Sequence, residues 1–472
     1  MASQLAASPT YQLQPSAEQV ALSTNYITSF DFLSQYLPDL YEKEFERYGN
    51  RTVSSFLRMV GAELPSASDL IKWAEQGRLH VKYTNCASGA AAASDTATIT
   101  VSDTGVTGIA LRKGQTIMLV ANNASGFNKG IVTSVNTSAG TFTVAYYEGG
   151  GQVFTSGTAI TVFIYGSEFK KGTDGMSGSL EAEDEFFETS PIIIKDNYSV
   201  SGSDMAQIGW VEITTEGGDT GYLWYLKSQG ETRLRFEDYM ETSMLEAVPA
   251  ETGSGVLSQT TFTDAGNKGT EGVFYVVGDR GNVWAGGNPT SLADFDTVVV
   301  RLDNQGAIAE NVLFTNRAFS FDIDDMLAAQ NSYGSGGTSY GLFNNSKDMA
   351  LNLGFTGFRR GYDFYKSDWK YLNDPTMRGG LPTGADSGRI NGLLVPAGSM
   401  SVYDQVLGQN IKRPFLHVRY RASQAENRRY KTWITGSAGG ASTSSLDAMQ
   451  VNFLTERAIC TLGANNFMLF EE

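Results

Sequence analysis

The spacing of apolar residues predicts one long helix in a chain whose other elements are short. Between Asp219 and Val248, apolar side chains recur at helical spacing, with Asp219 or Thr220 placed to cap the start and Pro249 to end it. A helix of that length would run about 40 Å. Shorter helices are predicted at three further places: 41–48, 66–77 and 317–330.

Residues 84–165 follow a different pattern, in which short runs rich in Thr and Val alternate with turns of Gly, Asn and Ser. This stretch holds only six charged residues. Five of its runs show the period-two alternation of strands, which is typical of a small β-barrel or sandwich. We interpret residues 81–165 as an inserted β domain.

The second half of the chain mixes predicted strands with occasional helices. Because it lacks a regular strand–helix alternation, an α+β class is favoured over a doubly wound α/β fold. Residues 166–218 carry little core signal and are predicted to form a long loop, a feature that usually has a function of its own. The strand candidates are 272–279, 295–303, 351–358, 362–372, 391–398, 415–423, 429–436 and 451–460, with Gly-rich loops at 262–287 and 332–338.

Composition narrows the function classes. The 472 residues carry a net charge of −16 and include two His and two Cys, too few for a zinc protein or a disulfide scaffold. The negative charge disfavours binding of nucleic acid by a broad basic surface. The chain shows neither a secretory signal nor an apolar run long enough for a membrane span, so we expect Cys86 and Cys460 to stay thiols in a reducing cytoplasm.

Three groups of residues were weighed as catalytic or metal sites. The acidic run 181–188 lacks the spacing of a calcium loop, so a solvated or docking segment is favoured. Asp322, Asp324 and Asp325 resemble a glycosidase carboxylate pair, but they fall where a helix is predicted to open, which favours a structural role. His80 and His417 lie in apolar runs and are predicted to be core or interface residues. We therefore predict no catalytic residue, cofactor or metal.

One local basic segment runs from Arg419 to Lys431. In so acidic a chain, pairing with acidic loops on a neighbouring copy is favoured over contact with nucleic acid. The predicted inter-subunit contact joins Glu181, Glu183, Asp184, Glu185 and Glu188 to Arg419, Arg421, Arg428, Arg429 and Lys431.

The order of parts resembles a known family. An N-terminal arm, an extended loop, one long helix, a mixed body and a closing strand follow one another as in the major capsid proteins of tailed bacteriophages, which have the Hong Kong 97-type fold. Within this family, the likeness is closest to crAss-like phages. The segments that carry it are 197–209, 314–331, 351–377 and, most strongly, 446–470 with Thr455-Glu456-Arg457-Ala458 and Gly463-Ala464-Asn465-Asn466-Phe467.

The resemblance implies a layout and a set of partners. It implies an arm with short helices (1–80), the inserted β domain (81–165), an extended loop (166–218), the spine helix of a peripheral domain (219–250), a mainly axial region (251–400), peripheral strands (401–450) and closing axial strands (451–472). It implies hexamers and pentamers around viral double-stranded DNA, which is touched only weakly. Portal, scaffolding and decoration proteins would be partners, and the virion capsid, assembled in the bacterial cytoplasm, would be the location.

Two other function classes remain open at this stage. A tail, fibre or other attachment protein fits the Thr- and Gly-rich insert, and a β-rich carbohydrate-active enzyme fits the strand content. The insert itself has two interpretations: it binds host glycans, decoration proteins or neighbouring capsomers, or it enlarges the contact between capsomers.

Overall fold

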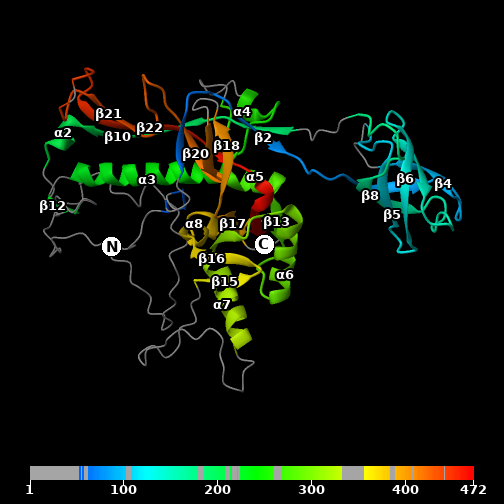
Figure 1. The fold of residues 1–472 in the computed structure, drawn as a ribbon. Helices are drawn as coiled ribbons and strands as arrows, with labels where there is room; N and C mark the ends of the chain where they lie inside the picture. Colours follow the sequence, from blue (N-terminus) through cyan, green and yellow to red (C-terminus); the bar gives the residue numbers. More distant parts are fainter. Residues whose placement is uncertain are drawn as a thin grey trace. The chain divides into compact units, whose positions relative to one another are not determined.

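Two compact units make up the chain. The computed structural model describes residues 53–54, 56–57, 62–102, 108–178, 184–207, 213–214, 220–221, 224–258, 267–331, 356–382, 388–404, 409–440 and 442–472. One unit comprises Met1–Lys72 and Glu188–Glu472, and the other comprises Trp73–Phe187 (Figure 1). Helices and strands are mixed throughout the first unit, as an α+β class predicts. The predicted helix at 41–48 and the loop at 332–338 lie outside the described residues.

The second unit contains a closed six-stranded barrel, with strands in the order β3-β4-β7-β6-β5-β8. Apolar side chains at alternate positions, among them Ile99, Leu119 and Val144, are fully buried inside it. The sequence pattern predicted five of these strands and missed β3, whose alternation is broken by a register shift between Tyr83 and Cys86. The strands are β3 (Lys82–Ser88), β4 (Thr96–Val101), β5 (Gln115–Ala121), β6 (Phe127–Asn136), β7 (Thr141–Tyr146) and β8 (Ala159–Ser167).

A five-stranded sheet in the first unit is built around its longest strand, β22 (Ala448–Thr461). β10 (Ile192–Ser201) pairs antiparallel along one edge of β22. The other edge is shared, since β20 (Leu416–Arg421) pairs with its second half and β21 (Lys431–Gly436) with its first. β1 (Glu63–Ser66) adds a parallel strand beside β20.

A six-stranded mixed sheet has the order β13-β23-β17-β14-β16-β15. Its inner strand β17 is buried along its whole length, because β23 and β14 flank it and helices cover the sheet. The strands are β13 (Asn282–Ala285), β14 (Glu310–Thr315), β15 (Gly357–Arg360), β16 (Tyr362–Asp368), β17 (Ile390–Pro396) and β23 (Met468–Glu471). The covering helices are α6 (Leu292–Gln305) and α7 (Arg317–Asn331).

The long helix predicted before Pro249 is confirmed as α3 (Trp224–Glu246), which spans about 35 Å. It lies along β10 and β22 (Figure 1), where Phe236 stacks on Phe453 with ring centroids 5.6 Å apart. The helix predicted at 317–330 is confirmed as α7. The remaining short elements are α2 (Gly202–Met205), α4 (Gly255–Ser258), α5 (Val273–Arg280), α8 (Lys370–Asn373), the 3₁₀ turns η3 (Arg378–Gly380) and η4 (Ala464–Asn466), and the strand pairs β2 (Ile71–Gln76) with β9 (Asp184–Thr189), β11 (Ile213–Thr214) with β12 (Thr220–Gly221), and β18 (Ser399–Asp404) with β19 (Gln409–Pro414).

Three secondary-structure predictions are wrong. The helix predicted at 66–77 is strand β2, whose half-buried and exposed residues alternate. The strand and loop predicted around 272–279 form helix α5, because Gly272 brings its backbone against the end of α3 and the Gly272 amide donates to the Ala247 carbonyl at 2.8 Å. The strand predicted at 295–303 is helix α6, which a reciprocal capping box between Ser291 and Asp294 starts.

The long loop predicted at 166–218 is confirmed at 168–178, but much of the rest that the structure describes is strand. β9 pairs with β2 in a two-stranded ribbon, and β10 is a full member of the five-stranded sheet. At the carboxyl end, β22 belongs to the five-stranded sheet and β23 to the six-stranded one. The chain therefore crosses between the two sheets at 462–467, beyond the boundary at 451 that the resemblance implied.

Truncation of a core residue should unfold the barrel alone. Phe142 is 1% exposed in the barrel, so Phe142→Ala is expected to destabilise that unit by about 3–5 kcal/mol. Hydrogen exchange should then quicken in 84–165 while β22 keeps its protection. The control Phe127→Ala removes a ring that is 54% exposed and should change stability by less than about 0.5 kcal/mol. Equal loss of protection in β22 would show that the two units unfold together.

Candidate functional site

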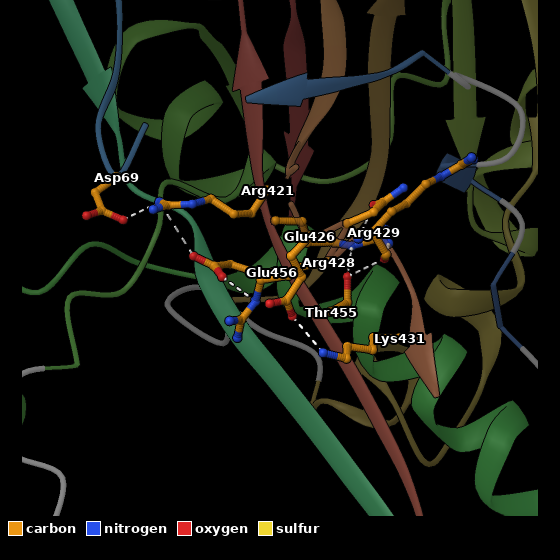
Figure 2. A network of polar contacts seen from close by, with 10 residues as sticks. Asp69, Arg421, Glu426, Arg428, Arg429, Lys431, Thr455 and Glu456 are labelled. Carbon is orange, nitrogen blue, oxygen red and sulfur yellow. Dashed lines mark hydrogen bonds and ion pairs between the residues drawn. The ribbon is translucent and has the colours of Figure 1, made fainter. Parts of the chain in front are cut away.

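The basic segment predicted as a contact site spans the end of β20, a short loop and the start of β21. An isolated bridge between Ala422 and Asn427 closes the loop. Because β20 and β21 share one edge of β22, the basic side chains gather beside the middle of that strand, as Figure 2 shows.

Glu456 on β22 is the centre of the first charged group. Its carboxylate lies 2.8 Å from Nε of Arg428, an ion pair without hydrogen-bond geometry, and 3.8 Å from Nη1 of Arg421. Arg421 also pairs with Asp69, which lies just before β2 (Figure 2). The Glu456 side chain is only 10% exposed, so these contacts are screened less than surface pairs.

Glu63 on β1 is the centre of the second group. It pairs with Arg429 and lies 3.4 Å from Nη1 of Arg457, whose side chain is only 5% exposed. The remaining donors of Arg457 are satisfied by Thr455 Oγ1 at 3.0 Å and by the Arg429 carbonyl at 3.0 Å. Burial lowers the pKa of the Arg457 guanidinium, and the Glu63 charge opposes that shift.

The outermost pair joins Lys431 to Glu426 at 2.7 Å, with both side chains more than two-fifths exposed. The hydrogen bond from Lys431 lowers the pKa of Glu426. Such exposed pairs contribute little, because water and salt screen them.

The acidic residues predicted as the other half of the contact lie elsewhere. Asp184 and Glu185 begin β9 and are exposed, whereas Glu181 and Glu183 lie outside the described residues. Glu188 pairs with Lys72 at 2.6 Å, both side chains being 55% exposed. All the ion pairs described here lie within one chain, and the contact between copies stays a prediction.

The carboxylates that pair with the basic segment could not be predicted from the sequence. Glu63 and Asp69 lie more than 340 residues before it, and Glu456 lies within a strand-like run. A charged Glu456-Arg457 pair inside an otherwise apolar strand was the one local signal, since buried charges require partners. Each of the five cations of the network lies beside at least one carboxylate, and Glu456 and Glu63 are each shared by two arginines.

The other candidate residues have structural partners. Asp322 accepts a hydrogen bond from Asn288 at 2.6 Å, and Asp324 pairs with Lys366, both carboxylates lying within α7 and not at its start. Within the residues that the structure describes, no group of three or more His, Cys, Asp and Glu side chains is placed to hold a metal ion.

The two histidines differ in their exposure to solvent. His417 is 3% exposed on β20, with Nδ1 3.2 Å from the Pro414 carbonyl, which confirms a core position. His80 is exposed within its own chain, so a core position is wrong for it, whereas an interface position with another copy stays a prediction. Burial lowers the pKa of His417 to about 4, with Arg419 contributing. Its cross-strand neighbour Cys460 is a buried thiol outside any disulfide, and burial raises its pKa to about 12. Cys86 is likewise buried and outside any disulfide.

Comparison with known proteins gives structural likenesses only. No protein-family model and no curated protein matches the chain. A structure described as Microbacterium phage Oxtober96 matches with a TM-score of 0.40 and 11% identity, covering 95% of this chain and 100% of that one. A capsid of an empty GTA particle matches with a TM-score of 0.37 and 9% identity, over 94% and 98% of the two chains. A holo-SrpI encapsulin complex from Synechococcus elongatus matches with a TM-score of 0.30 and 11% identity, over 61% and 77%.

At these TM-scores and identities, the similarity carries no argument about function. Among the described helices, none combines the length and apolarity that crossing a membrane requires.

Loss of Glu63 should be far more costly than loss of an exposed partner. Glu63→Ala leaves the buried Arg457 without its carboxylate, and we expect a loss of about 2–3 kcal/mol of unfolding free energy. Glu426→Ala, which removes the exposed partner of Lys431, should leave the unfolding free energy almost unchanged, because water and salt screen that pair. Urea unfolding of both variants measures the difference, and equal losses would contradict a structural role for the buried pair.

Acid should destabilise the first unit through His417. Its folded pKa of about 4 lies below the usual value of 6.5, so between these values the unfolded chain binds a proton that the folded chain does not. The His417 contribution to stability should fall by up to about 3 kcal/mol as the pH drops through this window, and His417 itself adds no further loss below it. His417→Gln should flatten the profile, whereas His80→Gln at an exposed position should leave it unchanged. An unaltered slope in His417→Gln would refute this source of acid sensitivity.

Proposed function

We propose that this chain is a shell subunit of the Hong Kong 97 capsid type. It self-assembles into hexamers and pentamers that form an icosahedral shell around double-stranded DNA in a phage virion. The observation that carries the proposal is the β2–β9 ribbon, an extended pair of strands beside which the described part of the chain places no third strand. Two-stranded ribbons are at best marginally stable in water, so this one requires a surface to lie on.

The ribbon carries the aromatic residues that such a surface would cover. Trp73 and Phe187 contact each other with ring centroids 6.3 Å apart. Phe186 is 72% exposed. A large ring so exposed on a ribbon favours contact with another protein surface, and a second copy of the chain supplies one at every position of a closed shell.

The N-terminal segment is anchored on α3. The amides of Val53 and Ser54 donate to Asp238 at 3.0 and 3.1 Å, and the amide of Phe56 donates to Glu241 at 2.9 Å. Both carboxylates are buried. An anchor of this kind gives an N-terminal arm a fixed starting point, and the arm would extend from it across a neighbouring copy.

The proposed partners follow from the same role. The chain would contact copies of itself, a portal, scaffolding proteins and decoration proteins, and would be assembled in the bacterial cytoplasm. Its net charge of −16 favours only weak, non-specific contact with packaged DNA. We assign it no catalytic activity and no cofactor.

The acidic and basic contact between copies remains part of the proposal. Glu181, Glu183, Asp184, Glu185 and Glu188 of one copy would approach the basic segment of the next. Carboxylates of the same chain already pair with Arg421, Arg428, Arg429 and Lys431. Each contact with another copy would therefore be an additional, solvent-exposed ion pair at the rim of this network, here called a rim pair. Rim pairs contribute about 0.5 kcal/mol each, and a shell repeats them at every interface.

Electron microscopy of the expressed chain tests the assembly. Closed shells or rings of capsomers are expected, and trimeric rods or a persistent monomer would contradict the proposal. Phe186→Ser should reduce the yield of shells several-fold, because it removes the most exposed ring of the ribbon. Phe127→Ser makes the same change at an exposed barrel position and should leave the yield unchanged.

Charge reversal tests the contact between copies. Changing Glu183, Asp184 and Glu185 to Lys should lower particle yield and the melting temperature of the shells, since like charges would then face the basic segment. Reversal of the exposed carboxylates Asp174, Glu251 and Asp279 alters the net charge equally and should have little effect. Unchanged yield and melting temperature in the first variant would refute the pairing.

A further inference from the structure

A hollow of about 640 Å³ lies on the barrel, within a single folded unit. Its volume falls in the range of small-molecule sites. Strands β5, β6 and β8 and the segment after β7 provide its lining, which is Thr116, Lys129, Tyr147, Glu148, Tyr165, Gly166, Ser167 and Glu168. None of these residues takes part in the charged network on the five-stranded sheet.

A β-bulge positions Tyr165 at the hollow. Thr116 of β5 pairs with Gly166 of β8, but the next residue of β5 pairs with Ile164, so Tyr165 is the extra residue. Bulges turn a side chain out of the regular alternation, and Tyr165 is 49% exposed. Gly166 leaves room for the close pairing, since a Cβ there would lie 3.1 Å from Thr116 Oγ1.

The other side of the hollow is fixed by hydrogen bonds. Tyr147 is also 49% exposed, and its hydroxyl donates to Glu168. Glu148 accepts the Lys129 amide at 2.9 Å and Nδ2 of Asn128 at 3.3 Å. Asn128 is fully buried and is itself held by the Gly151 carbonyl and the Val153 amide. The carboxylate is therefore positioned in advance, which reduces the entropy lost on binding.

The side chains of the hollow combine exposed rings with hydrogen-bonding groups. Tyrosine rings offer flat apolar faces with a polar edge, and the two carboxylates and the ammonium offer acceptors and donors. A sugar has the matching chemistry, since its C–H faces are apolar and its hydroxyl groups both donate and accept. Two exposed tyrosines beside fixed carboxylates therefore suit a saccharide better than a purely apolar ligand.

Charge selects among the possible ligands. Glu148 and Glu168 outweigh the single cation Lys129, so phosphate groups and acidic sugars would be repelled. The Lys129 ammonium already lies 5.7 Å from the centroid of the Tyr165 ring, where a cationic ligand would otherwise bind. A neutral ligand avoids both conflicts.

We propose that this hollow binds a neutral saccharide. Tyr147 and the part of the Tyr165 ring that Lys129 leaves exposed contact the apolar faces of the sugar. Glu148 and Glu168 accept hydrogen bonds from its hydroxyl groups, and Lys129 donates to them. The outer surface continues past the hollow, since Met118 of β5 lies between Lys129 of β6 and the exposed Phe163 of β8. An oligosaccharide is therefore favoured over a single sugar. This inference is independent of shell assembly, because every residue in it belongs to the barrel.

The test measures binding of defined oligosaccharides to the full chain by saturation-transfer NMR and calorimetry. The neutral probes are maltohexaose, cellohexaose, chitohexaose and mannohexaose, and sialyllactose is the acidic comparison. We expect at least one neutral probe to bind with a Kd near about 1 mM or below, and sialyllactose to bind more weakly. Tyr165→Ala and Glu148→Gln should each weaken binding about ten-fold or more. Tyr365→Ala, at a tyrosine 55% exposed in the six-stranded sheet, should leave binding unchanged.

Several results would overturn the proposal. No binding of any neutral probe at about 10 mM would do so, as would binding that survives both Tyr165→Ala and Glu148→Gln. Tighter binding of sialyllactose would overturn the charge argument. Hydrogen exchange of the barrel checks that the variants are folded. If Tyr165→Ala is destabilised, Glu148→Gln still tests the proposal, because it keeps the shape of the side chain. Shell formation is measured separately by microscopy, so either proposal can fail without the other.

Discussion

The first unit depends on β22, a strand of 14 residues buried over most of its length. β10 covers one of its edges, while β20 and β21 divide the other, so segments that lie far apart in the sequence become neighbours. One face of the same sheet holds α3 through the contact between Phe236 and Phe453. A strand enclosed in this way requires partners for the charged groups that it buries, because a buried charge without a partner is strongly unfavourable.

That requirement explains the charged network. Burial of Arg457 and Glu456 in the strand is unfavourable unless partners are present, and these come from β1, from β20 and from the loop before β21. The basic segment of an otherwise acidic chain is thus accounted for mainly by internal pairing. The network stabilises the fold mainly because it leaves no buried charge without a partner. This effect far exceeds the contribution of exposed members of the network such as Lys431. Any contact made there by another copy builds on a surface that is already ordered.

Local pattern predicted the elements whose burial follows a simple period. The alternation in the barrel and the spacing in α3 predicted these elements because each buries a regular face. β22 was predicted from its nearly continuous apolar run, because it is buried on both faces. The Val- and Phe-rich run of α5 favours a strand by local pattern, yet in the fold it is a helix that begins where Gly272 packs against the end of α3. The capping box of Ser291 and Asp294 is a local signal for the start of α6, which the strand-like run at 295–303 outweighed. The candidate site was predicted only in its basic half, since Glu63 and Asp69 become its neighbours through the parallel pairing of β1 with β20 and the turn that follows.

The topology of the insertion links the two proposals. The chain enters the barrel after β2 and leaves it before β9, and these strands pair with each other. The two ends of the inserted unit therefore lie close together, as tolerated domain insertions require. In a shell of many copies, each ribbon that docks on a neighbour would be accompanied by one barrel and one hollow. A millimolar affinity at a single hollow has little effect alone, but simultaneous engagement of many hollows on a polymeric saccharide raises the overall affinity by several orders of magnitude. Weak individual binding is therefore compatible with effective attachment when the sites are repeated on one particle.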